Sequence, residues 1–427
     1  MLIWLMQTGE PLPLESGVRK IRTALLADEL VASGHQVLWW TSNFEHQTKQ
    51  IKGPGPGRMA LAPDYDLWLM EGLPYSSNIS PRRYLHYKRL ASQFSSLARL
   101  ERVPDVILAS MPDYDLAHEA YLYGAERGVP VMVDVRDLWP DIFLQVAPAM
   151  AKPVLRLMLS GDYKRLRRLF GGAQSITAVS RGYLDWACLL GRRNPRAQDR
   201  VFYHGYPDPL PLGPNSEDSG IPWLSDLRGK VVFTFVGSFG AHYDLDLLVE
   251  AAKLLSEHDK QSVHFVLAGD GDKMPRLREA VRRLPNLTLT GWLNQEKIRT
   301  LLAASHVGLA ACLHPPDTLP NKPFEYLAYG LPLLSSLRGE MEEIIERYKL
   351  GYSYASGDLE GFLQLVGKLA DSPSLRENLS ANAKRAYETE FRAASIYKGF
   401  CRHIEEVVRG HRAARGAVSK QGRSAQA

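Results

Sequence analysis

Cysteine is scarce in this chain of 427 residues, which contains only Cys188, Cys312 and Cys401. The three lack paired spacing, which argues against a disulfide framework and a zinc site and favours a reducing compartment. No run approaches the roughly 18 consecutive apolar residues that a transmembrane helix needs. The opening segment, MLIWLMQTGE, has no basic leader and too short an apolar run for a signal peptide. We therefore expect a cytoplasmic protein.

A large excess of one charge is also missing, because the formal net charge is only +5. Five cations and no acid lie in the segment from residue 409 to the end, so the rest of the chain is close to neutral. No nucleic-acid-binding domain is indicated. The basic, Gly-, Ala- and Ser-rich composition predicts a disordered tail over 411–427.

Apolar, strand-like runs alternate with helical patterns along most of the chain, which is typical of parallel sheets covered on both faces. In the first half the expected strands are 2–6, 35–42, 67–70, 105–110, 129–135 and 175–180. The segment 51–66, IKGPGPGRMALAPDYD, is expected to be a surface loop.

The pattern breaks over 206–227, which is dense in Pro, Gly and polar residues, and restarts at KVVFTFVGSFG. We therefore predict an α/β protein with two doubly wound, Rossmann-like domains that face a central cleft, at 1–205 and 228–395. Residues 206–227 are then a linker. A terminal helix is expected at 396–410, where packing back on the first domain is one option.

The segment DTLPNKPFEYLAYGLPLLSS (317–336) predicts a short helix that leads into a buried strand. Asn321 suits the N-cap, Pro323 the first turn and Gly330 the position after the helix.

The start of this helix has two features of a nucleotide site. Its unpaired backbone N–H groups and the charge of Lys322 form an anion site. Glu325, one turn further, is placed to accept hydrogen bonds from vicinal hydroxyls, as the acidic residue of dinucleotide-binding folds does for ribose. The alternative is a well-capped helix with a solvated lysine.

The same segment resembles the carboxyl-terminal signature of retaining glycosyltransferases with the GT-B fold, family four. That signature has two acids separated by seven residues, here Asp317 and Glu325, with Asp in place of the usual first Glu. Four further segments resemble the family in its order: GVRKIRTALLADELVASGHQVLWWTS, GSFGAHYDLDLLVEAAKLL, LAGDGDKMPRL and TGWLNQEKIRTLLAASHVGLAA. DVRDLWPD (134–141) resembles a subgroup that builds bacterial surface polysaccharides on lipid carriers.

The resemblance implies a hexosyltransferase that moves a sugar from a nucleotide-diphosphate sugar, with UDP favoured over GDP, to a lipid-linked or oligosaccharide acceptor. Anomeric configuration would be retained, without a metal or a cofactor. Glu325 would hold the ribose, and Asp317 would lie near the donor sugar. The diphosphate would lie against the backbone of Gly237, Ser238 and Gly240.

In the first domain, a loop around Gly17 would close over the donor, and Asp137 would orient the acceptor hydroxyl or act as a base. The chain departs from the family where an Arg and a Lys usually neutralise the diphosphate, because GSFGAHYDLD has neither. The candidate replacements, with Lys322 preferred because of its place at the helix start, are Lys322, Lys273, Arg19 and Arg22.

The basic amphipathic segment 151–170 carries six cations against one acid, Asp162. It predicts either contact with an anionic membrane surface or a core-packed helix with a solvated basic edge. Two other function classes stay open. One is a sugar-nucleotide epimerase of the same architecture, which would need no acceptor site. The other is a non-catalytic nucleotide-sugar-binding protein.

Overall fold

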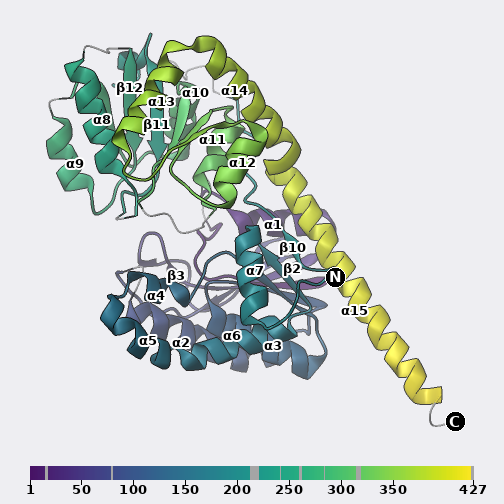
Figure 1. Cartoon of the computed structure of the whole chain (residues 1–427). Coiled ribbons are helices and arrows are strands. Elements are labelled where there is room, and N and C mark those ends of the chain that lie inside the picture. The colour runs from purple at the N-terminus through teal and green to yellow at the C-terminus, as the bar shows by residue number, and fades with distance from the viewer. Residues whose placement is uncertain are drawn as a thin grey trace. The chain divides into compact units, whose positions relative to one another are not determined.

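The computed structural model describes residues 1–14, 18–77, 80–211, 221–240, 242–258, 262–282, 284–313 and 319–424 (Figure 1). The chain forms two compact units. The first contains Met1–Tyr203 and Ile396–Ala427, and the second contains His204–Ser395. Each unit is built on one mainly parallel sheet with helices in the connections, so the predicted pair of Rossmann-like α/β domains is confirmed.

The sheet of the first unit has the order β10-β9-β8-β7-β1-β2-β6-β5. Its strands are parallel except β5, which pairs antiparallel with β6. Strand order reverses between β1 and β7, as in a doubly wound fold. The bounds are β1 (Leu2–Met6), β2 (Gln36–Ser42), β5 (Gly57–Ala62), β6 (Tyr65–Met70), β7 (Val106–Ser110), β8 (Val131–Val135), β9 (Ser175–Ala178) and β10 (Arg200–Val201); β3 (Phe44–Glu45) and β4 (Gln50–Ile51) form a separate pair.

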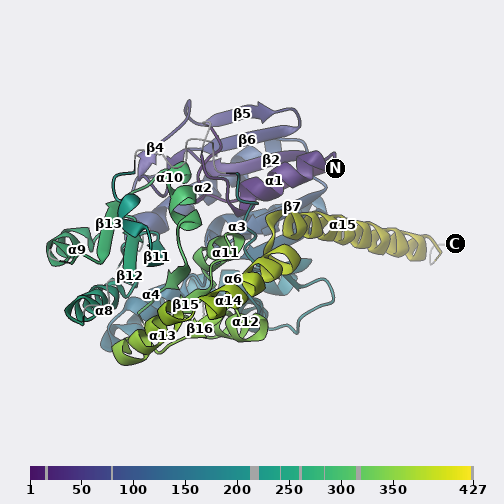
Figure 2. The same ribbon diagram turned by 90° about the horizontal axis from the view of Figure 1, so that it is seen from above.

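The prediction of a surface loop over 51–66 is wrong. Residues 57–62 form β5, which lies at the edge of the sheet beyond β6 and β2 (Figure 2). Its side chains alternate between exposed and half-buried, so the segment lacks the apolar run of an interior strand. Asp64, with φ of 61°, makes the tight turn into β6.

Helices of the first unit bury the apolar residues of the sheet. Leu2, Trp4 and Met6 alternate along β1 and belong to one core with residues of α2, α3, α6 and α7. Figure 1 shows α2, α3 and α6 along the same side of the sheet. The bounds are α1 (Arg22–Ala32), α2 (Pro81–Leu97), α3 (Tyr114–Arg127), α4 (Asp141–Val146), α5 (Lys152–Met158), α6 (Ser160–Gly172) and α7 (Arg181–Leu190).

The second unit has a fully parallel sheet of order β13-β12-β11-β14-β15-β16. Its strand order reverses between β11 and β14, and ligands of doubly wound folds bind outside the carboxyl ends of the strands at such a point. The strands are β11 (Val231–Val236), β12 (Val263–Ala268), β13 (Leu287–Gly291), β14 (Val307–Ala310), β15 (Leu333–Ser335) and β16 (Gly351–Ser353). The helices are α8 (Leu245–Glu257), α9 (Met274–Val281), α10 (Gln295–Ala303), α11 (Lys322–Ala328), α12 (Glu340–Tyr348), α13 (Leu359–Asp371) and α14 (Pro373–Ala386).

Part of the predicted linker belongs to the second unit. Asp208 accepts a hydrogen bond from the Tyr387 hydroxyl at 2.9 Å and forms an ion pair with Arg392. Residues 212–220 lie outside the described part of the chain.

The last helix, α15 (Ala393–Ser424), extends through the segment predicted as a terminal helix and into the predicted disordered tail. Its residues from Ile396 onward belong to the first unit, where Phe400 stacks on Phe202 with ring centroids 4.4 Å apart. Arg415 donates a hydrogen bond to the Gly128 carbonyl at 2.7 Å. Arg415, and Arg412 through its ion pair with Asp105, therefore bind the protein instead of being only solvated. Across the described residues, the helices are too short or too polar to cross a bilayer.

A buried ion network ties the first unit together where β8 ends. Arg22 donates to both carboxylate oxygens of Asp134 at 2.8 Å, and Arg136 and Thr177 donate to the same group at 2.6 and 2.8 Å. Burial opposes the ionisation of Asp134, but the two guanidinium groups outweigh it and hold its pKa below the usual range. Arg22 also donates to the Phe202 and Tyr203 carbonyls. These contacts give Arg22 a structural role, and they favour the other candidate cations as partners of a diphosphate.

We expect Asp134→Ala to lower the free energy of unfolding of the first unit by about 3–5 kcal/mol, because two buried guanidinium groups lose their counter-charge. Since the pKa of Asp134 is lowered in the folded state, its contribution is complete at neutral pH and is lost as the pH falls. In urea denaturation at a series of pH values, the free energy of unfolding of the variant should therefore fall less steeply with decreasing pH than that of the wild type. Asp28→Ala is the control, because Asp28 pairs with Lys20 at the surface and should cost at most about 1 kcal/mol. Equal losses would contradict the network's role.

Candidate functional site

The loop after β11 lies against the Lys322 side chain of α11, and its residue 237 has a backbone conformation that favours glycine. Gly237 has φ of +146°, and a Cβ added there would lie 1.9 Å from Cε of Lys322. Gly237 N–H donates to the Ala268 carbonyl at 2.9 Å, and Phe239 N–H to the Asp270 carbonyl at 2.8 Å. The loop after β11 is thus held against the loop after β12, with the lysine side chain lying directly on its backbone.

Lys322 lies on aromatic rings at the point where the strand order of the second unit reverses. Its Nζ is 3.7 Å from the ring centroid of Tyr243 and 5.0 Å from that of Phe235. A second ammonium group, that of Lys273, donates to the Tyr243 carbonyl at 2.7 Å. The pKa of His242 is lowered by burial and then by these two lysines. Positive groups therefore gather around the loop after β11.

Glu325, on the first turn of α11, is a buried carboxylate. It is 3 % exposed and accepts a hydrogen bond from the Tyr206 hydroxyl at 2.8 Å. The same helix is fixed to the sheet by Tyr326, whose hydroxyl accepts from the Val236 N–H at 2.9 Å and whose ring fills the space beside Gly308. Lys322 and Glu325 thus lie one turn apart at the carboxyl end of β11 and β14.

Predicted site residues of the second unit are brought together to different degrees. Gly237 and Lys322 are in contact, and Gly240 lies beside His242. Ser238 is exposed. Asp317 lies outside the described residues.

The prediction for Asn321 as a capping residue is wrong. It occupies the N-cap position, but its side chain accepts no capping hydrogen bond from the described residues. The reason is its helical backbone, with φ −67° and ψ −27°, whereas a capping side chain needs an extended one. Gly330 has the predicted left-handed conformation, with φ of 69°.

In the first unit, Asp137 follows β8 and precedes α4. Its Oδ1 accepts from the Leu138 N–H at 2.8 Å. Burial raises the pKa of Asp137, opposed by this hydrogen bond and by the charge of Arg83. The Arg83 guanidinium lies 4.6 Å from the ring centroid of Trp139. A carboxyl group with a raised pKa is therefore present at the carboxyl end of the first sheet.

Two other residues of the first unit, Asp141 and Arg19, have described positions. Asp141 accepts from the Tyr163 hydroxyl and, at 2.8 Å, from the Trp186 indole, which favours a structural role. Arg19 is half-buried ahead of α1. Gly17 lies outside the described part of the chain.

One group of possible metal ligands occurs within the described residues, away from these sites. His35, Cys401 and Glu405 bring their ligand atoms within 4.8 Å of one another. His35 immediately precedes β2, so the group lies at the amino edge of the sheet, opposite Asp137. A 3.0 Å hydrogen bond between His35 and Glu405 already accounts for this contact.

Residues 230–372 match the family model described as "Glycosyl transferases group 1". The match spans β11 to α13 and so includes Gly237, Lys322 and Glu325. No curated protein matches the chain.

Solved structures resemble almost the whole chain. Anabaena Alr3699/HepE in complex with UDP is 15% identical, with a TM-score of 0.65 over 95% of this chain and 99% of that one. Sucrose-phosphate synthase from Thermosynechococcus elongatus is 14% identical, with a TM-score of 0.72 over 96% and 99%. WaaG, "a glycosyltransferase involved in lipopolysaccharide biosynthesis", is 14% identical, with a TM-score of 0.63 over 93% and 98%. The chain has the GT-B fold. At these identities the resemblance concerns the fold alone, and it rests on the two sheets described above.

Tyr206 and Tyr243 are site residues that the sequence analysis missed. Tyr206 is 119 positions from Glu325 and lies in the segment predicted as a linker, so no local pattern connects them. Tyr243 is part of GSFGAHYDLD, and its position two residues before the start of α8 gave no sign that its ring contacts a lysine.

We expect Lys322→Met to raise the pKa of His242, because the ammonium group of Lys322 contributes to lowering it. The direction can be measured by following the imidazole resonances in an NMR pH titration. Lys253→Met is the matched control, because Lys253 is an exposed residue of α8 that pairs with Glu250. An unchanged His242 titration in the Lys322 variant would contradict the arrangement of the site.

Proposed function

We propose that the protein is a retaining glycosyltransferase, of the hexosyltransferase type, that uses a nucleotide-diphosphate sugar without a metal or a cofactor. The observation that carries the proposal is the contact of Lys322 with Gly237. It lies at the strand-order reversal of the second unit, inside the segment that matches the group 1 model. Neighbours of the same fold were crystallised with UDP and UDP-glucose, which supports UDP as the nucleotide.

Lys322 stabilises the negative charge that develops on the leaving diphosphate. A fixed charged group at that position lowers the energy of the transition state. Lys273 assists it, in place of the Arg and Lys that the resemblance leads one to expect. The backbone of Gly237, Ser238 and Gly240 lies along the phosphates.

The ribose hydroxyls bind Glu325 beside the Tyr206 hydroxyl. A carboxylate accepts hydrogen bonds at both oxygens, which suits the two vicinal hydroxyls of a ribose. Asp317 and the loop around Gly17 keep the donor-side roles implied by the resemblance. Arg19 stays a candidate cation for the diphosphate, and Asn321, at the start of α11, contacts the nucleotide.

The acceptor hydroxyl is oriented by Asp137, and the departing phosphate oxygen takes its proton on the same face of the sugar. The raised pKa of Asp137 supports a role in hydrogen bonding to a hydroxyl near neutral pH.

The acceptor is a lipid-linked saccharide at the cytoplasmic face of a membrane, in surface polysaccharide biosynthesis. Two parts of the segment 151–170 differ in burial. In α6, Leu166, Leu169 and Phe170 are buried in the core. Around α5, by contrast, large apolar side chains are exposed, namely Met150, Val154, Leu157 and Met158. That apolar surface supports membrane contact.

Glu325→Ala should weaken the binding of both UDP and uridine by about 1.5–3 kcal/mol, the usual effect of losing a charged hydrogen-bond partner. This corresponds to about 10- to 150-fold in Kd and can be measured by titration calorimetry. Glu325→Gln, which keeps the side chain's size, tests whether a fold defect is responsible, and Glu360→Ala on α13 is the surface control. Unchanged binding of both ligands would remove the ribose role.

Lys322→Ala should weaken UDP binding more than uridine binding, because only UDP carries the diphosphate. We expect a loss of about 1.5–3 kcal/mol for UDP from the missing charged partner, and Lys253→Ala should have no effect. Equal losses for the two ligands would mean that Lys322 supports the fold of the site without contacting phosphate. Sugar transfer to a membrane acceptor by the wild type separates a transferase from an epimerase or a binding protein.

A further inference from the structure

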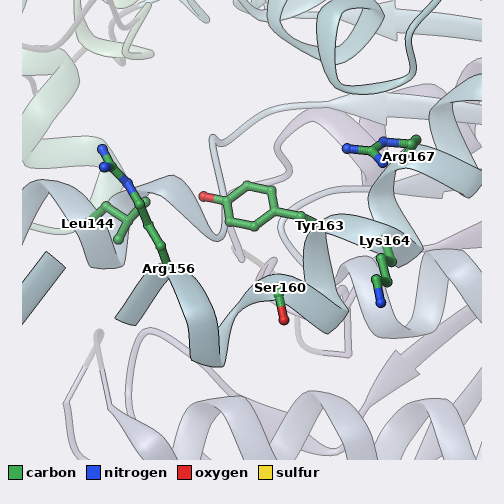
Figure 3. A pocket seen from close by; sticks show the side chains of 6 residues that line it. All are labelled: Leu144, Arg156, Ser160, Tyr163, Lys164 and Arg167. Carbon is green, nitrogen blue, oxygen red and sulfur yellow. The ribbon is translucent and has the colours of Figure 1, made fainter. Parts of the chain in front are cut away.

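The first unit contains a pocket of about 410 Å³ between α4, α5 and α6 (Figure 3). It is lined by Leu144, Arg156, Ser160, Tyr163, Lys164 and Arg167. The four lining residues of α6 follow helical spacing and so share one face of that helix. In Figure 3 the Tyr163 ring lies between Leu144 and Arg156 on one side and Arg167 on the other.

Positive charge in this pocket is not compensated. Three of its six lining residues are cations and none is an acid. Within the described residues, no acid pairs with Arg156, Lys164 or Arg167. Arg165, on the same helix, differs, because it forms ion pairs with Asp162 and Asp115 at 2.7 and 3.4 Å. A concave site whose charged lining residues are all cations attracts an anion.

The wall of the pocket is held in place by polar contacts behind it. Tyr163 and Trp186 both donate to Asp141, so the one nearby acid of α4 is used to join that helix to α6 and α7. The Asp141 carboxylate therefore accepts hydrogen bonds that join the helices. A fixed wall suits a ligand that accepts several hydrogen bonds from these cations. The guanidinium groups of Arg156 and Arg167 match the geometry of phosphate oxygens particularly well.

Large apolar side chains lie next to the pocket. Met150, Val154, Leu157 and Met158 are 94 %, 63 %, 75 % and 74 % exposed and belong to α5 and the turn before it. Arg156 of the pocket is on the same helix. A ligand that satisfies both features has an anionic head and an apolar chain.

The pocket also lies at the edge of the sheet where the acceptor is expected. The helix α4 begins four residues after Asp137, directly beyond the carboxyl end of β8. Because α6 leads into the parallel strand β9, its first turns are at this same edge.

We propose that this pocket binds the phosphate headgroup of a lipid embedded in a membrane, with the apolar side chains around α5 inserted beside it. As an acceptor-side site it rests on the proposed function. Binding of the lipid itself requires no sugar transfer.

The test is flotation of the full chain with phosphatidylcholine vesicles that contain or lack phosphatidic acid. We expect binding only with phosphatidic acid, and a loss of about 10- to 30-fold in Lys164→Ala/Arg167→Ala, as two surface cations would give. The control, Arg168→Ala/Arg192→Ala, removes the same charge from exposed positions outside the pocket and should change binding by less than about twofold if the pocket, rather than diffuse charge, is responsible. Equal losses in the two pairs would overturn the proposal.

Two further measurements separate the remaining outcomes. Leu157→Ser/Met158→Ser should reduce vesicle binding, because these side chains are expected to insert into the membrane. If the variant binds vesicles as well as the wild type does, and inorganic diphosphate competes with that binding, the ligand is a soluble phosphate and not a lipid. UDP binding is measured on the same samples. Intact UDP binding without vesicle binding overturns the lipid site and leaves the proposed function standing, whereas the opposite result overturns the donor site alone.

Discussion

Parallel strand pairing is the constraint on which the arrangement of this protein depends. Each parallel strand must be followed by a crossover before the next, so all carboxyl ends in a sheet meet at one edge. In the second unit this brings together the loop after β11 and the start of α11, which are more than 80 residues apart. In the first unit it brings Asp134, Asp137 and the start of α6 to the same edge. Chemistry in both units is therefore concentrated where strands end.

Cations have two different tasks at these edges. Arg22 and Arg136 surround the buried carboxylate of Asp134, and their hydrogen bonds serve the fold. Lys322 instead lies on the rings of Tyr243 and Phe235 and on the backbone of Gly237, where the aromatic faces attract its positive charge. The absence of a side chain at Gly237 is what allows that approach. The two environments separate structural from candidate functional residues better than residue type does.

Sequence reasoning found the architecture because the interior strands are continuous apolar runs between amphipathic helices, as parallel sheets require. It missed β5, because an edge strand with alternating exposure has no such run. It named Lys322, Glu325 and Gly237 from local helix and turn chemistry and from family resemblance. It did not find Tyr206 or the partnership of Arg22 with Asp134, because these depend on contacts between residues that are 119 and 112 positions apart.

The helix α15 gives the first unit an unusual assembly order. Its stacking of Phe400 on Phe202 and its hydrogen bond from Arg415 to Gly128 join the end of the chain to a sheet made from the beginning. On a ribosome, the second unit is complete once residue 395 has emerged, while the first still lacks its last helix. The unit synthesised first is thus the one that finishes folding last, and its exposed surface must stay unpaired while the whole intervening domain is made.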